Sequence, residues 1–531
     1  MESNFNIVTR LHRHAEKQPN HLALIQSGTK HDTQLSYAQL SSHTNAYAHF
    51  FSAHGVGKQD HVLLLIPPSP DFYAIFLALM QLGCTLMLID PGVGKKHIKA
   101  CLQMLKPSVL IGTPKAQLLR LYPELRHKLK AFCTHAFPFA YKLKPESKDV
   151  CTKNANIYAA QENHPALITF TSGSTGRPKA IVRTHGFLLR QGDELARLMH
   201  APADTIEFAT FPVFVLANLS QGITTVLPPS NIKTLATADF PSIAKCIEKH
   251  HVTRLLAAPD FCNRLALTPN AQTTLRTIEH IHTGGGPVHI NVLANLKKVM
   301  PQATIIALYG STEAEPIALQ NLSTSDPAML QAIAHGAGLP AGKPVDIIQL
   351  RIIKDQTGCS IPPLTQEAFE RMTLQENQTG EIVVTGPLVQ KGYMNKADNQ
   401  ETKFEVKTSL EADNQTWHRT GDAGYLDENG TLWLQGRSSA KIRINEQWVY
   451  PFAVEAAAAM HPQIRRAAFI QIKNKNILVL EGQPLQPQEE KELKQNLPYL
   501  HQITYLQNIP VDKRHHTKVL YKQLEEMLLN A

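Results

Sequence analysis

The sequence predicts an α/β fold with a large N-terminal α/β domain and a small C-terminal α+β domain. Up to about residue 340, short runs rich in branched apolar residues alternate with stretches of helical apolar spacing, a pattern typical of a mostly parallel sheet. Beyond that point the pattern changes to strands and turns. The length of 531 residues also exceeds what one hydrophobic core usually organises, so at least two domains are expected.

The N-terminal strands are predicted from brief apolar runs. These runs are residues 61–66, 85–90, 108–113, 167–170, 254–259 and 304–310. Residues 71–83 and 289–300 lie between such runs and repeat their apolar side chains nearer the helical period, so helices are expected there. This order favours parallel strands that are joined by helices.

The C-terminal part begins with strand-like runs at residues 380–386 and 423–437. The second run contains Asp-Glu-Asn-Gly between two apolar stretches, which predicts a hairpin. A short α+β pattern follows Arg437. We therefore predict one domain over residues 1–436 and a second over residues 437–531.

The composition is that of an ordinary folded protein, with 43% apolar and 18% charged residues. The N-terminus lacks the apolar segment of a signal peptide, and stretches such as residues 72–80 are too short to span a bilayer, so a cytoplasmic protein without a transmembrane segment is expected. Seven scattered cysteines without CxxC spacing argue against a disulfide framework and a zinc site. The net charge of +9 would suit ATP, CoA or a membrane surface, but no block of Lys and Arg stands out, and a mildly basic solvated surface is the simpler interpretation. No nucleic-acid partner is expected.

The most informative segment follows the run at 167–170 and reads Thr171-Ser-Gly-Ser-Thr-Gly-Arg-Pro-Lys179. Its glycines and hydroxyl side chains can form an anion-binding turn, and the lysine adds a charge for phosphate oxygens. It is not a Walker A loop, because the lysine follows a proline and precedes another apolar run. A flexible turn is the alternative. The predicted nucleotide-binding residues of this loop are Thr171, Ser172, Gly173, Ser174, Thr175, Gly176 and Lys179.

This segment resembles the signature of the adenylate-forming superfamily, which includes acyl-CoA synthetases, luciferases and the adenylation domains of peptide synthetases. Their signature is a strand followed by TSGSTGxPK, and the chain has it without a mismatch. The resemblance implies an adenylate-forming fold, in which the large domain binds AMP and the small domain is a lid. It also implies Mg²⁺- and ATP-dependent activation of a small-molecule carboxylic acid to acyl-AMP with release of pyrophosphate.

Two further motifs follow in family order. Gly284-Gly-Gly-Pro287 is either a tight turn or, with Gly284 and Gly285, a backbone surface on which adenine lies. Tyr309-Gly-Ser-Thr-Glu313 ends a predicted strand, where ligands collect in open α/β sheets. The resemblance implies that Tyr309 stacks on adenine, Thr312 contacts phosphate and Glu313 holds Mg²⁺, which suits the oxygen ligands of a hard cation.

The C-terminal motifs complete the predicted site. Asp422 matches the family's TGD, where a carboxylate accepts hydrogen bonds from ribose, and Arg437 matches a second ribose or phosphate contact. Lys518 matches the terminal catalytic lysine, which would stabilise charge as the carboxylate attacks the α-phosphate. On sequence alone Lys513 and Arg514 compete with Lys518, and motif position favours Lys518.

Two features of the sequence bear on which carboxylic acid is activated and on the reaction that follows adenylation. Residues 210–222 occupy the region in which the family shapes its acyl pocket, and their apolar side chains favour a fatty acid, although they could equally be core. At the hinge, Ala440 stands where an aspartate is usual and Glu446 where a glycine is usual, which casts doubt on the domain rotation that serves thioester formation. The segments at 88–94, 170–185, 417–437 and 510–518 most resemble olefin β-lactone synthetases.

The sequence therefore predicts adenylation of an apolar, 3-hydroxy fatty acid and then closure of a β-lactone by the substrate's own hydroxyl. The main alternative is a long-chain fatty acid–CoA or carrier-protein ligase, and CoA is a substrate only under that alternative. A nucleotide-binding pseudo-enzyme is a third interpretation, which the intact phosphate loop, Glu313 and Lys518 disfavour. Assembly with other enzymes of a lipid pathway is compatible with this function.

Overall fold

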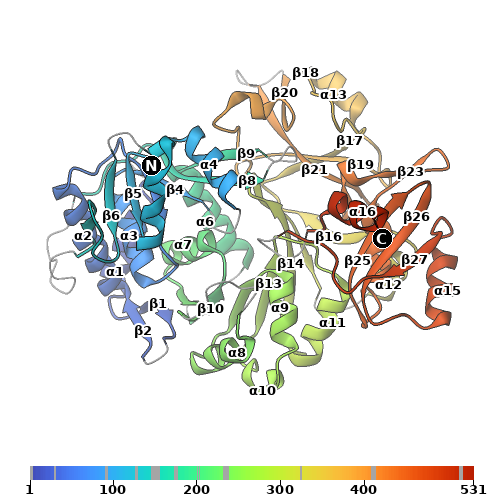
Figure 1. Ribbon diagram of the computed structural model, residues 1–531, viewed down its shortest axis with the longest axis horizontal. Helices are drawn as coiled ribbons and strands as arrows, with labels where there is room; N and C mark the ends of the chain where they lie inside the picture. The colour runs from blue at the N-terminus through green and yellow to red at the C-terminus, as the bar shows by residue number, and fades with distance from the viewer. Residues whose placement is uncertain are drawn as a thin grey trace. The chain divides into compact units, whose positions relative to one another are not determined.

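The computed structural model describes residues 4–28, 31–89, 94–125, 129–144, 156–172, 177–199, 201–202, 204–230, 238–322, 326–407, 414–512 and 518–530. The chain divides into two compact units (Figure 1). The first is Met1–Leu256 with Gly392–Asn395, and the second is Ala257–Lys391 with Lys396–Ala531. The domain boundary predicted after residue 436 lies inside the second unit and stays a prediction.

A seven-stranded sheet in the first unit carries the predicted phosphate loop. Its strand order is β7-β6-β5-β3-β4-β8-β9, and all neighbours are parallel except β8 and β9. The bounds are β3 (His61–Leu65), β4 (Thr85–Leu88), β5 (Val109–Gly112), β6 (Lys130–Cys133), β7 (Tyr141–Lys142), β8 (Pro165–Ser172) and β9 (Pro178–Thr184). The parallel strands predicted from the alternating pattern are thereby confirmed.

A second group of strands in this unit runs in the order β12-β10-β11-β1-β2 and is parallel except for β1 with β2. Their bounds are β1 (Leu22–Gln26), β2 (Thr33–Ser36), β10 (Ile206–Ala209), β11 (Thr224–Leu227) and β12 (Arg254–Ala257). The helices are α1 (Val8–Lys17), α2 (Tyr37–Ala53), α3 (Pro70–Gln81), α4 (Lys95–Met104), α5 (Pro114–Gln117), α6 (His185–Met199), α7 (Pro212–Gln221) and α8 (Phe240–Lys249).

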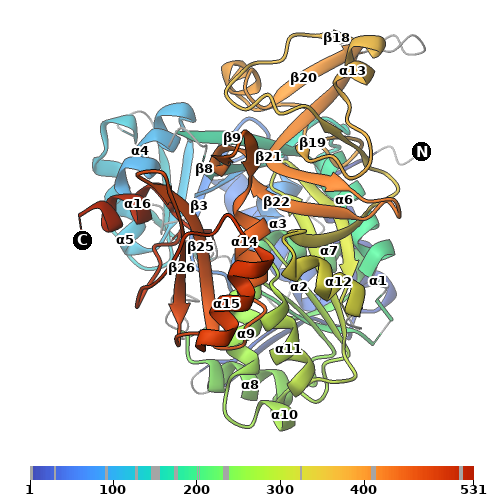
Figure 2. The ribbon, with the colours of Figure 1, turned by 90° about the vertical axis from the view of Figure 1, so that its right-hand side faces the viewer.

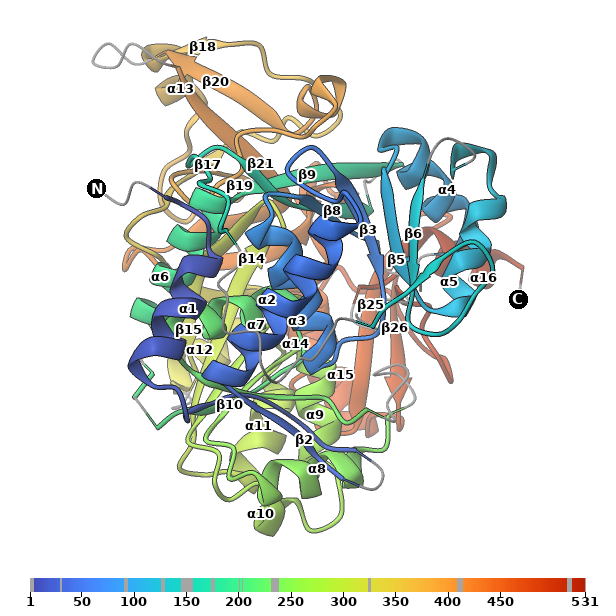
Figure 3. The same cartoon turned by 90° about the vertical axis from the view of Figure 1, so that its left-hand side faces the viewer.

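Helix α3 forms the centre of the first unit's core. The Ser69 side chain caps its N-terminus by accepting from the Phe72 N–H, and Pro70 occupies its first turn, where no intrahelical donor is lost. After Pro70, ten residues of the helix are buried, and none of them is charged, so α3 is packed on every side. Helix α2 lies beside it (Figure 3). A helix that is apolar on all sides belongs in a protein core. This explains why the segment is so apolar although it is too short to span a membrane.

The second unit begins with β13 and β14 in parallel and continues through antiparallel pairs in the order β14-β15-β16-β22-β21-β19-β17. The strands are β13 (His280–Gly284), β14 (Thr304–Ser311), β15 (Ala314–Asn321), β16 (Leu339–Pro344), β17 (Gln349–Ile353), β18 (Leu364–Thr365), β19 (Gly380–Thr385), β20 (Lys403–Lys407), β21 (Gln415–Leu426) and β22 (Leu432–Arg437). The helices are α9 (Pro259–Ala266), α10 (Ala271–Thr274), α11 (Ile290–Val299), α12 (Pro327–Ala334) and α13 (Gln366–Met372).

The predicted hairpin joins β21 and β22. Asp427 closes its turn, because one carboxylate oxygen accepts from the N–H groups of Asn429 and Thr431 at 2.9 Å each. The other oxygen accepts from the Trp433 indole at 2.9 Å. An aspartate that binds the backbone two residues on is a usual turn former, and here it fixes the register of β21 against β22.

The last part of the second unit is a three-stranded sheet, β25-β26-β27, between helices. Along β25, Phe469 packs with α14 and α15, whereas Ala468 and Ile470 pack with α16 on the other face (Figure 2). The bounds are β23 (Ile442–Ile444), β24 (Gln447–Val449), α14 (Pro451–Ala458), β25 (Ile464–Ile472), β26 (Lys475–Gly482), α15 (Pro487–Asn496), β27 (Gln502–Tyr505) and α16 (Tyr521–Leu529). This is the α+β pattern expected after Arg437.

Candidate active site

Two strands of the first unit hold the ends of the predicted phosphate loop. Thr171 near the end of β8 pairs with Lys179 at the start of β9, so the loop is the turn of a hairpin and a strand follows it. This agrees with the distinction from a Walker A loop. The loop residues Gly173, Ser174, Thr175 and Gly176 lie outside the described residues, as does the side chain of Ser172.

Lys179 is buried, with 5% of its surface exposed. Its ammonium lies 5.5 Å from the centre of the Tyr393 ring, a cation–π arrangement. Tyr393 forms a β-bridge with Ile181, and the Met394 N–H donates to the Ala180 carbonyl at 3.0 Å. The segment Gly392–Asn395 therefore lies along β9 and holds the lysine at the base of the loop.

In the second unit, Asp422 and Arg437 lie opposite each other on β21 and β22. The guanidinium donates to one carboxylate oxygen at 2.9 Å, and the Tyr309 hydroxyl from β14 donates to the other at 3.0 Å. A carboxylate accepts about four hydrogen bonds, and the Asp422 side chain is 22% exposed, so it retains acceptor capacity toward solvent. Two predicted site residues, Tyr309 and Arg437, thus donate to the carboxylate of a third, Asp422.

The charges of this cluster reinforce one another. The Asp422 carboxylate raises the pKa of Arg437, which stays a fixed cation. Burial raises the pKa of Tyr309 well above its usual value, and Asp422 adds to that effect, so Tyr309 stays a neutral hydrogen-bond donor. The cluster therefore offers a guanidinium cation, an aromatic face and a carboxylate acceptor.

Thr312 and Glu313 form the turn between β14 and β15. The Gln390 N–H donates to the Glu313 carbonyl at 2.8 Å, and Ala314 forms a β-bridge with Val389, so a neighbouring segment fixes this turn. Among the residues that the structure describes, no group of three His, Cys, Asp or Glu side chains could hold a metal ion. A single half-buried carboxylate such as Glu313 fits a Mg²⁺ ion that takes its other ligands from water and phosphates.

Lys518 is held by hydrogen bonds of its own backbone. Its N–H donates to the Asp512 carboxylate and its carbonyl accepts from the Asp512 N–H, both at 2.9 Å, while Val511 bridges Val519. Desolvation and the Arg437 charge lower the pKa of Lys518, while Asp422, Asp512 and Glu313 oppose that shift. Lys518 thus lies within electrostatic reach of the Asp422–Arg437 pair and of Glu313. Lys513 and Arg514 lie outside the described residues.

The glycines at 284 and 285 have structural explanations of their own. A side chain at Gly284 would place its Cβ 2.5 Å from the Leu308 carbonyl oxygen on the adjacent strand β14. Gly285 has a φ of 79°, which favours glycine. The tight-turn interpretation therefore accounts for both residues, and their contact with adenine stays a prediction.

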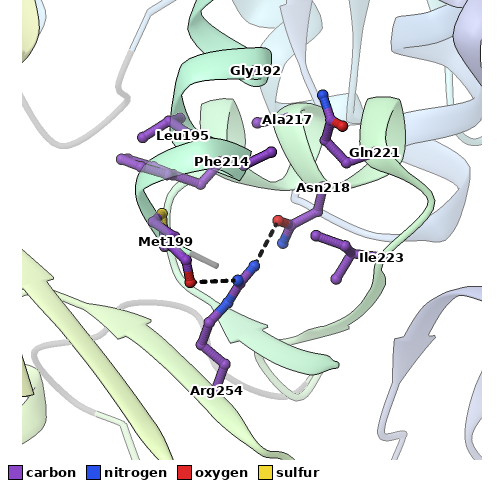
Figure 4. Close-up of a pocket in the computed structure, with 10 residues that line it drawn as sticks. Gly192, Leu195, Met199, Phe214, Ala217, Asn218, Gln221, Ile223 and Arg254 are labelled. Atoms are coloured by element: carbon purple, nitrogen blue, oxygen red, sulfur yellow. Dashed lines mark hydrogen bonds between the residues drawn. The ribbon is translucent and has the colours of Figure 1, made fainter. Parts of the chain in front are cut away.

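The apolar segment at residues 210–222 forms α7 in the first unit and divides between two roles. Phe214, Val215 and Leu216 are buried, and the latter two belong to the central core. Phe211, Pro212 and Val213 are half-buried. A cavity of about 10 Å³, about the size of one water molecule, lies between α6 and α7 (Figure 4).

An ion pair behind this cavity was not predicted from the sequence. The Arg254 guanidinium donates to the Glu207 carboxylate at 2.5 Å, and Asn218 of α7 donates to the same carboxylate at 2.6 Å. Arg254 and Glu207 are 3% and 1% exposed. The signal that could have revealed the pair is a single charge within each of the apolar runs 206–209 and 254–257, because a lone charge in a buried strand requires a partner.

The hinge region contains a second group that sequence reasoning missed. Ala440 ends a short 3₁₀ turn, and the adjacent Lys441 donates to the Asp355 carboxylate at 2.7 Å. The Tyr450 hydroxyl donates to the same oxygen at 3.0 Å. Glu446 is exposed in the β23–β24 turn with a φ of 68°. The residues after the hinge are therefore tied to Asp355, which follows β17.

An apolar cluster strengthens this connection. Ala456 of α14 packs with Ile333 of α12, Leu339 of β16 and Trp433 of β22. The Asn291 side chain of α11 also donates to the Ile464 carbonyl at 2.9 Å. These contacts join α14 to β22, the strand that carries Arg437, and β25 to α11.

Within the described part of the chain, none of the helices has the length and apolar character needed to cross a bilayer. The model of the family described as "AMP-binding enzyme" matches residues 11–394. The chain is 29% identical over 495 residues to an olefin beta-lactone synthetase of Xanthomonas campestris, covering 90% of this chain and 87% of that protein.

A second relative is an olefin beta-lactone synthetase of Stenotrophomonas maltophilia, which is 27% identical over 539 residues, covering 97% of this chain and 96% of that protein. Among solved structures, an anthranilate CoA ligase in complex with anthranoyl-AMP superposes with a TM-score of 0.78 at 17% identity, covering 100% of this chain and 99% of that one. This likeness confirms the predicted adenylate-forming fold, with a large N-terminal part and a small C-terminal sheet.

Proposed function

The chain belongs to the AMP-binding enzyme family, and on this premise we propose that it adenylates an apolar 3-hydroxy fatty acid and then closes it to a β-lactone. The coarser statement follows from the family itself: the chain is an adenylate-forming enzyme that activates a carboxylic acid with ATP. The observation that carries the residue assignments is the meeting of Tyr309, Asp422 and Arg437, with Lys518 and Glu313 in electrostatic reach.

In the adenylation step, a carboxylate oxygen of the acid attacks the α-phosphorus of ATP. The bond from that phosphorus to the bridging oxygen breaks, and pyrophosphate leaves with the electron pair. Negative charge grows on the α-phosphate oxygens, and a cation held there beforehand stabilises it without reorganisation. We assign this role to Lys518, because desolvation and the Arg437 charge lower its pKa and the negative charge of an arriving phosphate would offset that shift, while the exposed side chain can reach a ligand.

The remaining residues bind and orient the nucleotide. Asp422 would accept hydrogen bonds from ribose hydroxyls with its spare acceptor capacity, and Arg437 would contact ribose or phosphate. Tyr309, neutral because its pKa is raised, would stack on adenine while its hydroxyl holds Asp422 in place. Thr312 would contact phosphate, as would Lys179 and the loop at 171–176. Glu313 would hold Mg²⁺, which supplies charge neutralisation on the phosphates when bound.

The apolar acyl chain is the less direct part of the proposal. Phe211, Pro212 and Val213 at the start of α7 are half-buried and uncharged, so they offer no partner to a substrate ammonium and suit an apolar chain. The printed activity of two relatives that match most of this chain adds support. Their names describe those proteins, and transfer to this chain is our proposal.

For the second step we favour attack by the substrate's own 3-hydroxyl on the acyl-AMP carbonyl carbon. The new carbon–oxygen bond closes a four-membered ring, the bond from the carbonyl to phosphate oxygen breaks, AMP leaves, and the hydroxyl proton passes to solvent. A tethered nucleophile reaches effective molarities of about 10⁵ M or more. Attack by the substrate's own hydroxyl requires no thiol to enter the site, so it requires no rotation at the hinge. The contacts of Lys441 and Tyr450 with Asp355 favour this route, because they hold the segment after the hinge in place.

Product analysis distinguishes the lactone from its alternative. The enzyme is incubated with ATP, Mg²⁺ and a 3-hydroxy fatty acid or its analogue without the hydroxyl, each with and without CoA. We expect the hydroxy acid to turn over without CoA, and the plain acid to stop as bound acyl-AMP after about one pyrophosphate per site. Multiple turnovers to acyl-CoA from the plain acid, detected by mass spectrometry, would replace the lactone with a fatty acid–CoA ligase.

A further inference from the structure

The positive charge of the chain is concentrated in one segment of the first unit. Residues 94–144 contain eleven Lys and Arg residues and one acidic residue, Glu124, which is a net charge of +10. The whole chain carries +9, so all other residues together carry −1. This one segment of the sequence therefore accounts for the entire excess of positive charge.

The same segment carries exposed apolar side chains. Ten large apolar residues are exposed among those that the structure describes, and four of them lie within 24 residues of sequence here. Leu118 and Leu121 in the turn after α5 are 55% and 71% exposed, and Phe139 and Tyr141 near β7 are 93% and 53% exposed. Single exposed apolar residues are ordinary, whereas a group of four with a concentrated charge indicates a contact surface.

Structural contacts bring the two parts of this group together. The Arg120 guanidinium, between Leu118 and Leu121 in sequence, donates to the Pro138 carbonyl at 3.2 Å. The Tyr141 ring packs 5.4 Å from Phe132 of β6, and β7 is the outermost strand of its sheet. Helix α5, which precedes Leu118, packs against β5 and β6 on the β7 side of the sheet, and Figure 3 shows it near β6. We call Leu118, Leu121, Phe139, Tyr141 and the lysines at 115, 142 and 144 the basic apolar surface.

Phe139 occupies a backbone position that its residue type disfavours. It has a φ of 55° at the tip of a turn in which the Ala140 N–H donates to the Phe137 carbonyl at 3.3 Å. Pro138 precedes it, and the order Pro then positive φ is that of a type II turn, where glycine is preferred at the second central position. A bulky residue there costs free energy of folding, and its side chain gains no burial in return. Such a position is explained if the phenyl ring contacts something outside the chain.

We propose that the basic apolar surface docks on an anionic lipid bilayer. Lys and Arg near such a surface are attracted by its negative potential, and apolar side chains gain by entering the boundary between headgroups and acyl chains. Both kinds of residue occur together here, on an edge of the first unit. This proposal does not depend on the assignment of β-lactone closure, since none of these residues is assigned to the reaction.

Two other occupants fit the surface less well. A nucleic acid would use the charge, and aromatic rings could stack on bases, but Leu118 and Leu121 would gain nothing from a phosphate backbone. A second copy of the chain would bring the same excess of positive charge to the contact, which repels it unless salt screens the charge. An anionic bilayer complements the charge and accepts all four apolar side chains.

The test is flotation of the full chain with vesicles of phosphatidylcholine alone or with 30 mol% phosphatidylglycerol. We expect binding to the anionic vesicles only, weakening as salt rises. Two charge reversals, Lys142→Glu with Lys144→Glu, are expected to weaken the partition coefficient roughly tenfold or more. The matched control reverses Lys473 and Lys475, which are also exposed lysines beside a strand, and should leave binding unchanged.

Phe139→Gly separates lipid contact from folding. Glycine suits the positive φ, so the melting temperature should stay equal or rise, whereas binding to anionic vesicles should fall severalfold. Leu267→Ala, which truncates a leucine of the second unit that is 63% exposed, should not affect binding. ATP–pyrophosphate exchange without vesicles should be unchanged in every variant.

Four results would overturn the proposal. They are equal binding to neutral and anionic vesicles, no loss with the 142/144 reversals, no loss with Phe139→Gly, and tighter binding to a DNA duplex than to vesicles at equal phosphate concentration. Self-association of the chain that Phe139→Gly abolishes would assign the surface to a second copy instead. A failure of adenylation in the unaltered chain would count against the proposed function and leave vesicle binding as a separate result.

Discussion

Two arginine–carboxylate pairs of the chain, one in each unit, differ in exposure. Arg254 and Glu207 in the first unit are 3% and 1% exposed, whereas Arg437 and Asp422 in the second are 53% and 22% exposed. Both pairs bridge neighbouring strands and both recruit a third polar group, Asn218 in one case and Tyr309 in the other. The same kind of ion pair is thus found in a core and at a solvent-exposed position.

The difference shows that burial determines which role an ion pair can have. A buried pair cannot exchange partners, because an unpaired charge in the core is costly, so Glu207 and Arg254 are confined to holding β10, β12 and α7 together. An exposed pair loses little when a ligand replaces part of it. Asp422 and Arg437 can therefore accept a nucleotide while staying in contact. Four predictions test this comparison, in order of decreasing effect.

The largest effect is expected from Arg254→Met. The substitution leaves the Glu207 carboxylate buried, where burial already raises its pKa, and should cost about 3–5 kcal/mol of the free energy of unfolding. Urea denaturation measures the change. Adding Glu207→Leu, which removes the orphaned charge, should recover most of the loss. Arg437→Met, the matched change in the exposed pair, should cost less than about 1 kcal/mol; an equal cost in both pairs would refute the distinction.

The second prediction concerns the rate of adenylation and not the stability of the fold. Lys518→Ala should lower pyrophosphate release about 10²–10³-fold, because one preorganised charge is lost at the reacting phosphate. The melting temperature should not change, since Lys518 is bound to Asp512 through its backbone N–H and carbonyl, which alanine retains. A rate within threefold of the unaltered enzyme would assign the role to another lysine, and Lys513→Ala in the same assay would then identify it.

The contrast between the pairs also explains what the sequence could predict. Asp422, Arg437 and Tyr309 lie in ordered motifs, so their meeting followed from strand order and resemblance. The predicted strands at 61–66 and 304–310 and the helix at 71–83 likewise follow from local apolar patterns, and the structure has β3, β14 and α3 there. Such features depend on the periodicity of apolar residues and on the spacing of motifs, and both can be obtained from a single sequence.

Features that depend on partners distant in sequence escaped prediction. Glu207 pairs with Arg254 across 47 residues, and Lys441 with Asp355 across 86. A lone charge in an apolar run indicates that a partner is needed, but it does not identify which distant residue that partner is. The apolar segment at 210–222 was equally ambiguous, because a pocket wall and a core helix have the same composition. The structure divides it, with Val215 and Leu216 in the core and Phe211 half-buried.

The third prediction concerns nucleotide binding by the exposed pair. Asp422→Ala removes the acceptor that Tyr309 and Arg437 share, and should weaken ATP by about 1.5–3 kcal/mol through the loss of charge-assisted hydrogen bonds to ribose. Calorimetric titration of the folded variant measures this change. The comparison is with Asp193→Ala, which removes an exposed carboxylate that pairs with Arg10 in the first unit and should leave ATP affinity unchanged. Unchanged affinity in Asp422→Ala would remove that residue from the site.

The smallest effect is expected at the pair of intermediate exposure, Lys441 and Asp355, which are 19% and 14% exposed. Burial tends to raise the pKa of Asp355, but hydrogen bonds from Lys441 and Thr357 outweigh it and the pKa is lowered. A carboxyl with a lowered pKa in the folded state adds stability above its ordinary pKa of 3.8 and loses it as the pH falls through the folded-state value. Asp355→Asn should therefore cost about 1 kcal/mol at neutral pH, and the difference from the unaltered chain should shrink below pH 4.

This pair also tests the connection between the hinge and the reaction. If the contact of Lys441 with Asp355 helps hold Lys518 near Arg437, then Asp355→Asn should slow pyrophosphate release by up to about fivefold, the equivalent of 1 kcal/mol, with the ATP affinity unchanged. Glu446→Gln is the matched control, since it neutralises a carboxylate that pairs with Arg443 in the adjacent hairpin but is 87% exposed. It should change neither stability nor rate. A loss of stability in Asp355→Asn without any loss of rate would show that the contact supports the fold alone, and that the apolar packing of α14 on β16 and β22 is enough to keep Lys518 in place.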